Sequence, residues 1–342
     1  MLARLPALIA VVALSLIAGS NGGSVASSAR RPAGDGRATL RSEYLIVAAG
    51  DIACASNPGS STTSCRYDDT ATLIDGRGVD AVLALGDNQY NVGAYDDYTR
   101  YFDPTWGVVK GRIHPVPGNH EYAQDPDATP SGYFRYFGDR VRGTDGLGYY
   151  SYDVGACPNA PCWHLIALSS ELCFANGGCD RATDPNDPGA GNRMFAWLKA
   201  DLAAHPNDEY PCTLAYWHHP LFSFSTGSGA TQAVLPLWRL LARADADIVL
   251  NGHSHNYQRW APQTPAGASS PTGIREFVVG TGGASHYAIA GGTYPSHLVE
   301  AQADAFGVLR LALKATGYRW EWVSAPGQPA FEDIAGHLAP CR

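Results

Sequence analysis

The sequence predicts an α/β fold: a four-layer αββα sandwich in which helices flank two mixed β-sheets. Short, continuously apolar runs of the kind found in strands buried on both faces alternate with segments of helical spacing. Five of these runs each end in a short polar cluster. Because sites in α/β folds lie outside the carboxyl ends of strands, we expect the clusters to meet at one edge.

The amino terminus has the pattern of a secretory signal peptide. Arg4 precedes an uncharged run over 5–19, too short to span a bilayer, and small residues follow. We therefore expect a signal peptide over 1–29, cleaved between 20 and 29, and a flexible tail over 30–42. An uncleaved membrane anchor is the alternative. No later segment reaches transmembrane length, so we expect an exported protein whose mature form has no membrane span.

Residues 43–342 are enough to bury a large core as one domain. The strands predicted in the first half cover residues 44–49, 81–85, 113–116, 149–154 and 163–168. Those predicted in the second half cover residues 213–217, 248–250, 277–279, 307–313 and 318–323. Helical spacing appears at about 68–74, 194–205 and 234–243. Stretches rich in Gly, Pro and Asp predict loops over 123–148 and 176–192.

The net charge and the cysteine content indicate which classes of protein fit this chain. A formal net charge of −8 argues against a nucleic-acid-binding surface. Eight cysteines in an exported chain predict four disulfides. Proximity in the sequence suggests the pairs Cys54–Cys65, Cys157–Cys162 and Cys173–Cys179, which leaves Cys212–Cys341. A cysteine-rich metal site is the rival reading, but the chain contains no C-x-x-C pair.

The five polar clusters supply the ligands for two adjacent metal ions. They are Gly50-Asp51, Gly86-Asp87-Asn88-Gln89-Tyr90, Gly118-Asn119-His120-Glu121, His218-His219-Pro220 and Gly252-His253-Ser254-His255. One carboxylate can bridge two cations, and histidines two positions apart can serve different ions. A lone Gly-Asp or Gly-Asn is more often a turn. The whole set instead indicates a hydrolase that uses a two-metal centre on a phosphate ester.

The order of these clusters resembles that of the calcineurin-like metallophosphoesterases, and within them the purple acid phosphatases. The resemblance runs from about Tyr44 to Thr281. Ala53 stands where many relatives in the wider superfamily carry a metal-binding histidine. Tyr90 stands where the purple enzymes place an iron-binding tyrosinate. These two details favour the purple branch, here as a single-domain, secreted member whose catalytic domain covers 43–342.

The resemblance implies a ligand set for each ion. The ligands implied for the first ion, Fe(III) by this resemblance, are Asp51, Asp87, Tyr90 and His255. Those implied for the second ion, which could be Zn, Fe(II) or Mn(II), are Asp87, Asn119, His218 and His253. Asp87 would bridge the two ions. His218 is preferred to His219 because the family places a proline two residues after its ligand, and Pro220 fits.

The resemblance also implies a reaction. Metal-bound hydroxide would attack a phosphate monoester, and His120 would stabilise the developing charge or protonate the leaving group. A phosphodiesterase or nucleotide hydrolase with the same centre is the alternative, and a non-catalytic binding module is a third reading. In either enzyme reading the partners are small phosphorylated substrates.

One feature departs from the purple acid phosphatase pattern. Several members carry a further substrate-facing histidine after the fourth cluster, but residues 220–227 contain none. His219 or His286 is the tentative substrate-binding replacement. His219 could equally lie behind the ligands or be structural.

Overall fold

The computed structural model describes residues 41–59, 61, 63–76, 78–123, 130–158, 161–174, 178–180 and 189–342. The predicted signal peptide over 1–29 and all but the last two residues of the predicted tail lie outside the described residues. The chain divides into Met1–Thr39 and a compact unit over Leu40–Arg342. The elements below all belong to the second unit.

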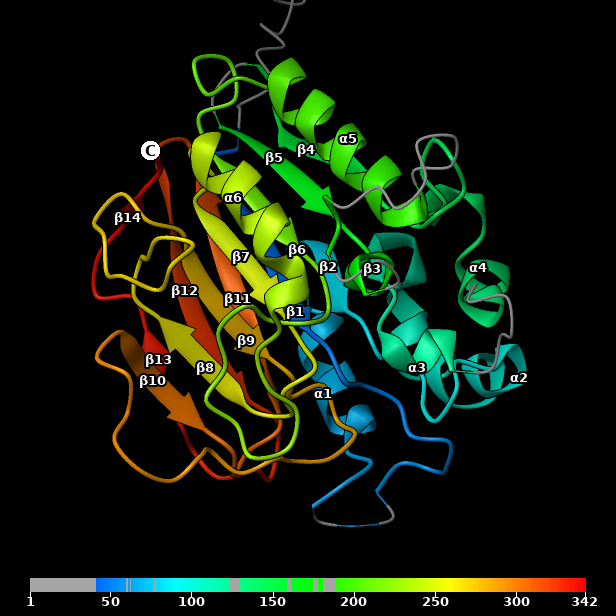
Figure 1. Cartoon of the computed structure of the whole chain (residues 1–342). Coiled ribbons are helices and arrows are strands. Elements are labelled where there is room, and N and C mark those ends of the chain that lie inside the picture. The colour runs from blue at the N-terminus through cyan, green and yellow to red at the C-terminus, as the bar shows by residue number, and fades with distance from the viewer. Residues whose placement is uncertain are drawn as a thin grey trace, which may run out of the picture. The chain divides into compact units, whose positions relative to one another are not determined.

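Two mixed sheets form the centre of this unit (Figure 1). The first sheet has the order β13-β12-β11-β1-β2-β3, and β14 also pairs with β12. Its strands are β1 (Glu43–Ala49), β2 (Val79–Leu85), β3 (Ile113–Val116), β11 (Gly307–Lys314), β12 (Gly317–Ser324), β13 (Asp333–Ile334) and β14 (Ala339–Pro340). Strands β1, β2 and β3 run parallel, and β11 is antiparallel to β1.

The second sheet has the order β10-β8-β9-β7-β6-β5-β4. Its strands are β4 (Tyr150–Gly155), β5 (Cys162–Ala167), β6 (Thr213–Tyr216), β7 (Ile248–Asn251), β8 (Tyr257–Trp260), β9 (Arg275–Val279) and β10 (Leu298–Gln302). Its middle strands, β5, β6, β7 and β9, are parallel, and antiparallel strands close both edges.

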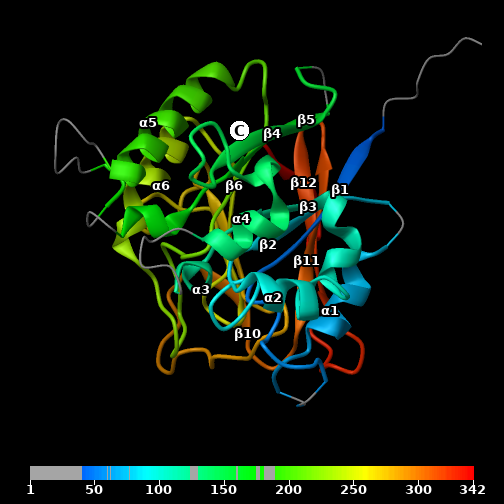
Figure 2. The same cartoon turned by 90° about the vertical axis from the view of Figure 1, so that its right-hand side faces the viewer.

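Helices cover the outer faces of the sheets. The α-helices are α1 (Tyr67–Ile74), α2 (Tyr95–Asp97), α3 (Asn119–Tyr122), α4 (Ser131–Phe137), α5 (Gly189–Ala204) and α6 (Leu235–Arg243). Figure 2 shows α5 and α6 on the opposite side of the sheets from α1. The other helical segments are the π-helix η1 (Tyr98–Phe102) and the 3₁₀-helices η2 (Trp106–Arg112), η3 (Asp139–Val141), η4 (Ser170–Cys173) and η5 (Gln232–Val234). The predicted fold class, two mixed sheets flanked by helices, is confirmed.

The central strands, such as β2, β5, β6 and β7, are largely apolar because both of their faces are buried. In β6, Leu214 and Tyr216 pack in the core between the sheets. Ala215 packs on the other face, in a second core with Met194 of α5 and Trp238 of α6. Side chains alternate across a strand, so one short apolar run serves both cores. This explains why the strands were readable from the sequence.

The structure corrects two predictions about loops. Residues 123–148 were expected to lack regular structure, yet they contain α4, whose Tyr133 and Phe137 are buried. Its aromatic side chains pack on one another and on η1, and such tertiary packing overrides weak local helix propensity. Helix α5 begins at Gly189, within the stretch predicted as a loop over 176–192.

All four predicted disulfides form: Cys54–Cys65, Cys157–Cys162, Cys173–Cys179 and Cys212–Cys341. The last pair joins the end of the chain to the start of β6. In the part of the chain that the structure describes, no helix combines the length and apolarity needed to cross a bilayer.

Candidate metal centre

Parallel strands bring the predicted ligands to one edge of each sheet. Asp51 follows β1 and Asp87 follows β2, and the two loops are joined by a hydrogen bond from the Asp51 amide to the Gly86 carbonyl, 3.1 Å. In the second sheet, β6 leads to His218 and β7 to His253. The amide of Gly252 donates to the carbonyl of His218 at 3.0 Å, which holds these two loops together.

Three of the candidate ligands have a strained backbone. Asp51, Asp87 and His253 have φ values of 61°, 47° and 67°, in the left-handed region. That region costs a residue with a Cβ roughly 1–2 kcal/mol, and such residues concentrate at functional sites.

Glycines let these loops approach closely. A Cβ on Gly118 would lie 2.3 Å from Oδ1 of Asp87, and one on Gly252 would lie 2.7 Å from Oδ2 of Asp51. No side chain fits in either place. The glycines that precede Asn119 and His253 are therefore required by the packing of the centre.

The first half of the centre gathers around the Tyr90 hydroxyl. This oxygen lies 3.0 Å from Oδ1 of Asp51, 3.2 Å from Oδ2 of Asp87 and 2.9 Å from Nε2 of His255. Nε2 of His255 is also 3.1 Å from Oδ1 of Asp51. The four residues predicted as ligands of the first ion are thus brought together.

The second half gathers around His218. Its Nε2 lies 3.2 Å from Oδ2 of Asp87 and 3.3 Å from Nδ1 of His253. The same Asp87 oxygen also belongs to the first half, which places this carboxylate between the two groups. The structure therefore brings six of the seven predicted ligands into two clusters that share Asp87.

Asn119, the seventh predicted ligand, carries the best indication that a cation belongs here. The next backbone amide, that of His120, donates to Oδ1 of Asp87 at 2.9 Å. The side-chain oxygen of Asn119 is buried and has no hydrogen-bond partner among the described residues. A buried acceptor without a donor costs free energy unless something else satisfies it. A bound cation would satisfy the Asn119 oxygen, so the donor set fits a two-metal centre.

The charges of the centre also fit a bound cation. Burial opposes the ionisation of Asp87, but the positive charge of His218 beside it holds the pKa of Asp87 well below its ordinary value. Burial, together with Asp51 and Asp87, raises the pKa of Tyr90 well above its ordinary value. A phenolate at Tyr90 therefore requires a strongly Lewis-acidic partner.

His120 lies on the solvent side of this centre. Its ring packs on Tyr90, with 4.3 Å between centroids, and its Nδ1 donates to the carbonyl of Asn91. Its Nε2 is 3.8 Å from Oδ2 of Asp87, and about a third of the side chain is exposed. This side chain is thus oriented by a backbone contact and within reach of a molecule bound at the clusters.

The two tentative substrate residues have different surroundings. The His219 ring lies beside His253, with 4.0 Å between centroids. His286 stacks on Phe306 at 3.8 Å, and both of its ring nitrogens are buried without a partner among the described residues. A substrate role for His286 stays a prediction.

Glu121 is a residue of the centre to which the sequence analysis gave no role. Its Oε1 accepts hydrogen bonds from the amides of Asn88 and Gln89, at 2.9 and 3.1 Å, and from the hydroxyl of Tyr98. Its Oε2 accepts from the amide of Gly118, at 2.7 Å. The carboxylate thus ties the Asp87 loop to the Asn119 loop. Its place in the third polar cluster was the available signal.

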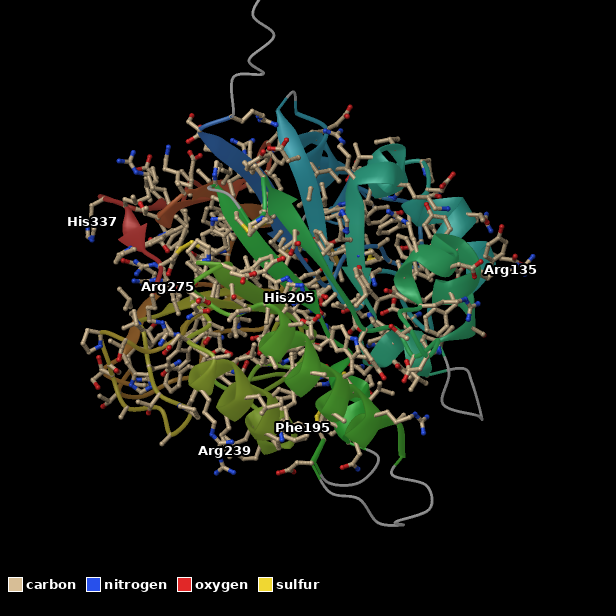
Figure 3. All side chains as sticks on the ribbon, turned by 90° about the horizontal axis from the view of Figure 1, so that it is seen from above. Arg135, Phe195, His205, Arg239, Arg275 and His337 are labelled. Carbon is tan, nitrogen blue, oxygen red and sulfur yellow. A yellow bond between two sulfur atoms is a disulfide. The ribbon has the colours of Figure 1, made fainter. Side chains whose placement is uncertain are left out.

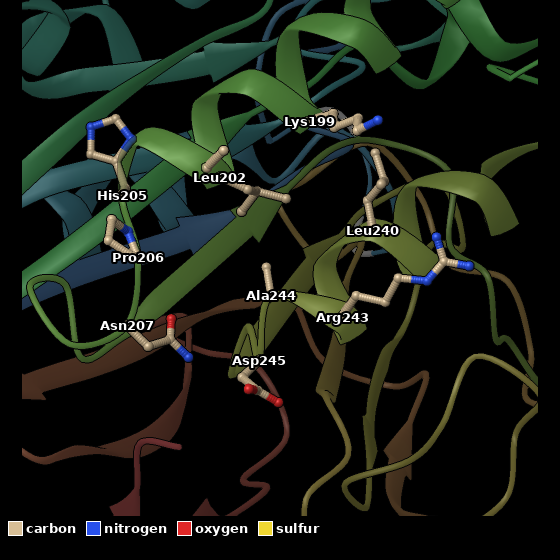
Figure 4. A pocket seen from close by; sticks show the side chains of 10 residues that line it. Lys199, Leu202, His205, Pro206, Asn207, Leu240, Arg243, Ala244 and Asp245 are labelled. Atoms are coloured by element: carbon tan, nitrogen blue, oxygen red, sulfur yellow. The ribbon is translucent and has the colours of Figure 1, made fainter.

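A separate cavity of about 390 Å³ opens between the carboxyl-terminal ends of α5 and α6 (Figure 4). Leu202, His205 and Leu240 are among the side chains around it. It contains none of the predicted site residues.

Comparison with known proteins agrees with this geometry. The model of the calcineurin-like phosphoesterase family matches residues 44–257. Purple acid phosphatase 18 of Arabidopsis thaliana is 26% identical over 204 residues, which cover 56% of this chain and 41% of that protein. Rat tartrate-resistant acid phosphatase type 5 is 26% identical over 208 residues, covering 55% of this chain and 58% of that protein. The chain thus spans about half the length of these relatives.

Two solved structures share the fold. A purple acid phosphatase from yellow lupin seeds superposes with a TM-score of 0.64 at 17% identity, covering 85% of this chain and 53% of that one. GAP50 of Plasmodium, described as the anchor in the inner membrane complex, superposes with a TM-score of 0.62 at 14% identity. The superposition covers 88% of this chain and 90% of the GAP50 chain. With the family match over most of the described unit, the chain belongs to the calcineurin-like phosphoesterases.

Proposed function

We propose that this protein is an exported, metal-dependent phosphatase of the purple acid phosphatase type, which hydrolyses phosphate monoesters. The observation that carries the proposal is the convergence of two donor clusters on Oδ2 of Asp87. The buried, partnerless amide oxygen of Asn119, which precedes the residue whose amide bonds to Asp87, supports it.

The residues divide into two ligand sets. Asp51, Tyr90 and His255 would hold the first ion together with Asp87. Asn119, His218 and His253 would hold the second, again with Asp87. A phenolate ligand suits a hard, acidic ion such as Fe(III), and the imidazoles suit Zn or Fe(II), with Mn(II) a further candidate.

Two such ions would supply an activated water molecule and neutralise charge on the phosphoryl group. The protein's own contribution begins with Asp87, whose carboxylate sets the spacing of the two halves. His120 is the group that reaches the substrate, because it is partly exposed and its ring is fixed by Asn91. From there, Nε2 can stabilise charge on the phosphoryl oxygens or pass a proton to the leaving alkoxide.

Two other functions compete with this one. A phosphodiesterase or nucleotide hydrolase could use the same residues. A non-catalytic role is suggested by the structural likeness to a protein described as an anchor. The complete donor set favours an enzyme, since a binding module has no need for three strained ligand residues.

Export rests on the disulfides and on the amino-terminal pattern. The protein has four disulfides. Disulfides persist in oxidising surroundings and are rare in cytosolic proteins. We propose that residues 1–29 direct export and that 43–342 are the catalytic domain. Mass spectrometry of the exported protein would locate the cleavage point.

The deciding experiment combines metal analysis with a substrate screen. The exported protein should contain two metal ions per chain, release phosphate from aryl monoesters faster than it cleaves aryl diesters, and show a visible band from tyrosinate bound to Fe(III). Asp87→Ala should lose both metal and activity. A colourless but active zinc or manganese protein would remove the role given to Tyr90. A metal-free wild-type protein without phosphatase activity would overturn the proposal.

A further inference from the structure

Two of the three candidate ligand histidines, His218 and His255, share one arrangement of their ring nitrogens, whereas His253 turns its Nδ1 toward His218. In His218, Nδ1 donates to the carbonyl of Leu85 at 2.9 Å while Nε2 faces Asp87. In His255, Nδ1 bonds to the Ser285 hydroxyl at 2.8 Å while Nε2 faces Asp51. Metal-binding histidines are held in this way, with the outer nitrogen fixed so that the inner one presents its lone pair.

His219 has the same arrangement, although the sequence favours its neighbour as the ligand. Its Nδ1 lies 3.0 Å from the hydroxyl of Ser170 and 3.0 Å from Oε1 of Glu171. The hydrogen bond is directed at Ser170, and the carboxylate lies beside it. Its backbone amide also donates to the Ser170 hydroxyl, at 3.2 Å. Nε2 has no partner among the described residues.

The His219 ring lies beside the second half of the centre. One ring nitrogen of His219 lies within 4.8 Å of those of His218 and His253. The rings of His219 and His253 are 4.0 Å apart, and that of His219 is nearly perpendicular to that of His218, at 88°. The two adjacent histidines therefore approach the same space from different directions.

The segment behind His219 is built to hold the ring. Ser170 and Glu171 lie in η4, which the Cys173–Cys179 disulfide closes. The edge of Phe174 packs against the His219 ring, with 4.8 Å between centroids. Only 6% of His219 is exposed. A histidine that is merely structural needs no carboxylate on its outer side, since burying that group costs free energy.

We propose that His219 is a third imidazole ligand of the second metal ion, and that Glu171 is its positioning residue. The inference rests on the proposed function, because it assumes that the centre binds metal. It has a consequence for metal choice. Nitrogen ligands favour zinc over manganese, which prefers oxygen, so His219 would bias the second position toward zinc.

The test compares metal affinity in four proteins: wild type, His219→Gln, Glu171→Gln and His337→Gln. His337 is exposed and lies at the outer edge of the described unit (Figure 3), which makes it a matched control. Zinc and manganese dissociation constants are measured by chelator competition. His219→Gln should weaken zinc binding more than manganese binding. Glu171→Gln should weaken zinc binding roughly 10- to 100-fold, as for other outer partners of ligating histidines. The control should match the wild type.

A second measurement needs no variant. X-ray absorption at the zinc edge of the wild-type protein, with both positions filled by zinc, should count one more imidazole per pair of ions than the seven-residue set provides. Unchanged zinc affinity in His219→Gln, with weaker inhibition by inorganic phosphate, would instead make His219 a substrate contact. Failure of the proposed function would look different, because the wild type itself would then bind no metal.

Discussion

At the scale of single residues, Asp87 organises the centre because its two carboxylate oxygens face different groups. Oδ1 accepts the amide of His120, and Oδ2 lies between Tyr90 and His218. The side chain is almost entirely buried. His120, the residue proposed to reach the substrate, and the residues proposed to bind metal are thus connected through one carboxylate.

His120→Ala tests whether the residue that reaches the substrate is separable from the metal ligands. No predicted ligand bonds to the His120 ring more closely than 3.8 Å, so the variant should keep its metal. Its turnover of an aryl phosphate should fall by roughly 10²–10⁴-fold, as is typical when a positioned acid is lost. Metal content and turnover are measured on the same sample. A metal-replete variant with wild-type turnover would remove this role.

Glu121→Gln tests the carboxylate that joins two ligand loops. The amide keeps the shape of the side chain, but one of its two ends becomes a donor facing the backbone amides that Glu121 accepts. We expect metal affinity to fall by roughly 10- to 100-fold, the usual effect of losing an outer partner. Isothermal titration with zinc measures this. Equal affinities in variant and wild type would show that the loops hold their places without the carboxylate.

At the scale of elements, the centre depends on loops that leave parallel strands and meet without intervening side chains. Strands β1, β2 and β3 end at the same edge, as do β6 and β7 in the other sheet. The candidate ligands lie in the first residues after each strand, where the backbone is anchored by the sheet. The positions of the candidate ligands relative to one another therefore depend on how closely the loops can pack.

Gly118→Ala tests this packing. The added Cβ would meet Oδ1 and the backbone nitrogen of Asp87, at 2.3 and 2.5 Å, so one of the two loops must move. We expect loss of metal binding and an unfolding free energy lower by roughly 1–3 kcal/mol. Gly111→Ala is the matched control, because nothing lies within 4 Å of its added Cβ. Chemical denaturation and metal analysis of both variants provide the comparison.

At the scale of the whole described unit, a buried ion-pair chain joins the second sheet to the helix that covers it. His164 of β5 is 1% exposed, with Nδ1 2.8 Å from Asp153 of β4 and Nε2 2.8 Å from Asp201 of α5. Burial opposes a charge on this ring, but the hydrogen bonds to Asp201 and Asp153 outweigh it and raise the pKa of His164. The folded protein therefore favours the imidazolium.

His164→Gln should make the thermal stability less dependent on pH. Because the pKa in the folded state is above the ordinary value of about 6.5, the stabilisation is complete below that pH. It is lost as pH rises through the raised folded-state value. The melting temperatures of wild type and variant should thus differ most in mildly acidic buffer and converge in alkaline buffer. A difference that does not vary with pH would contradict a charged His164. His337→Gln again serves as the control.

The sequence analysis predicted the central strands because each is apolar on both faces. It also paired all the cysteines, and it singled out the polar clusters that the structure brings together, since these lie directly after strands. It did not find α4, which is stabilised by aromatic packing on η1, nor the part played by Glu121. Both features depend on contacts with residues that are distant along the chain or lie in adjoining loops. The local pattern of apolar and polar residues does not indicate such contacts.

The sequence by itself determined the layered fold, the disulfides and the kinds of donor atom available, because these follow from periodicity, cysteine spacing and residue chemistry. Only the tertiary structure decided which oxygen of Asp87 is shared by the two halves and which residues stand behind His219. The physical reason is that both outcomes depend on contacts between loops that belong to two separate sheets. The distances between atoms of such loops are set by three-dimensional packing and not by the order of residues along the chain.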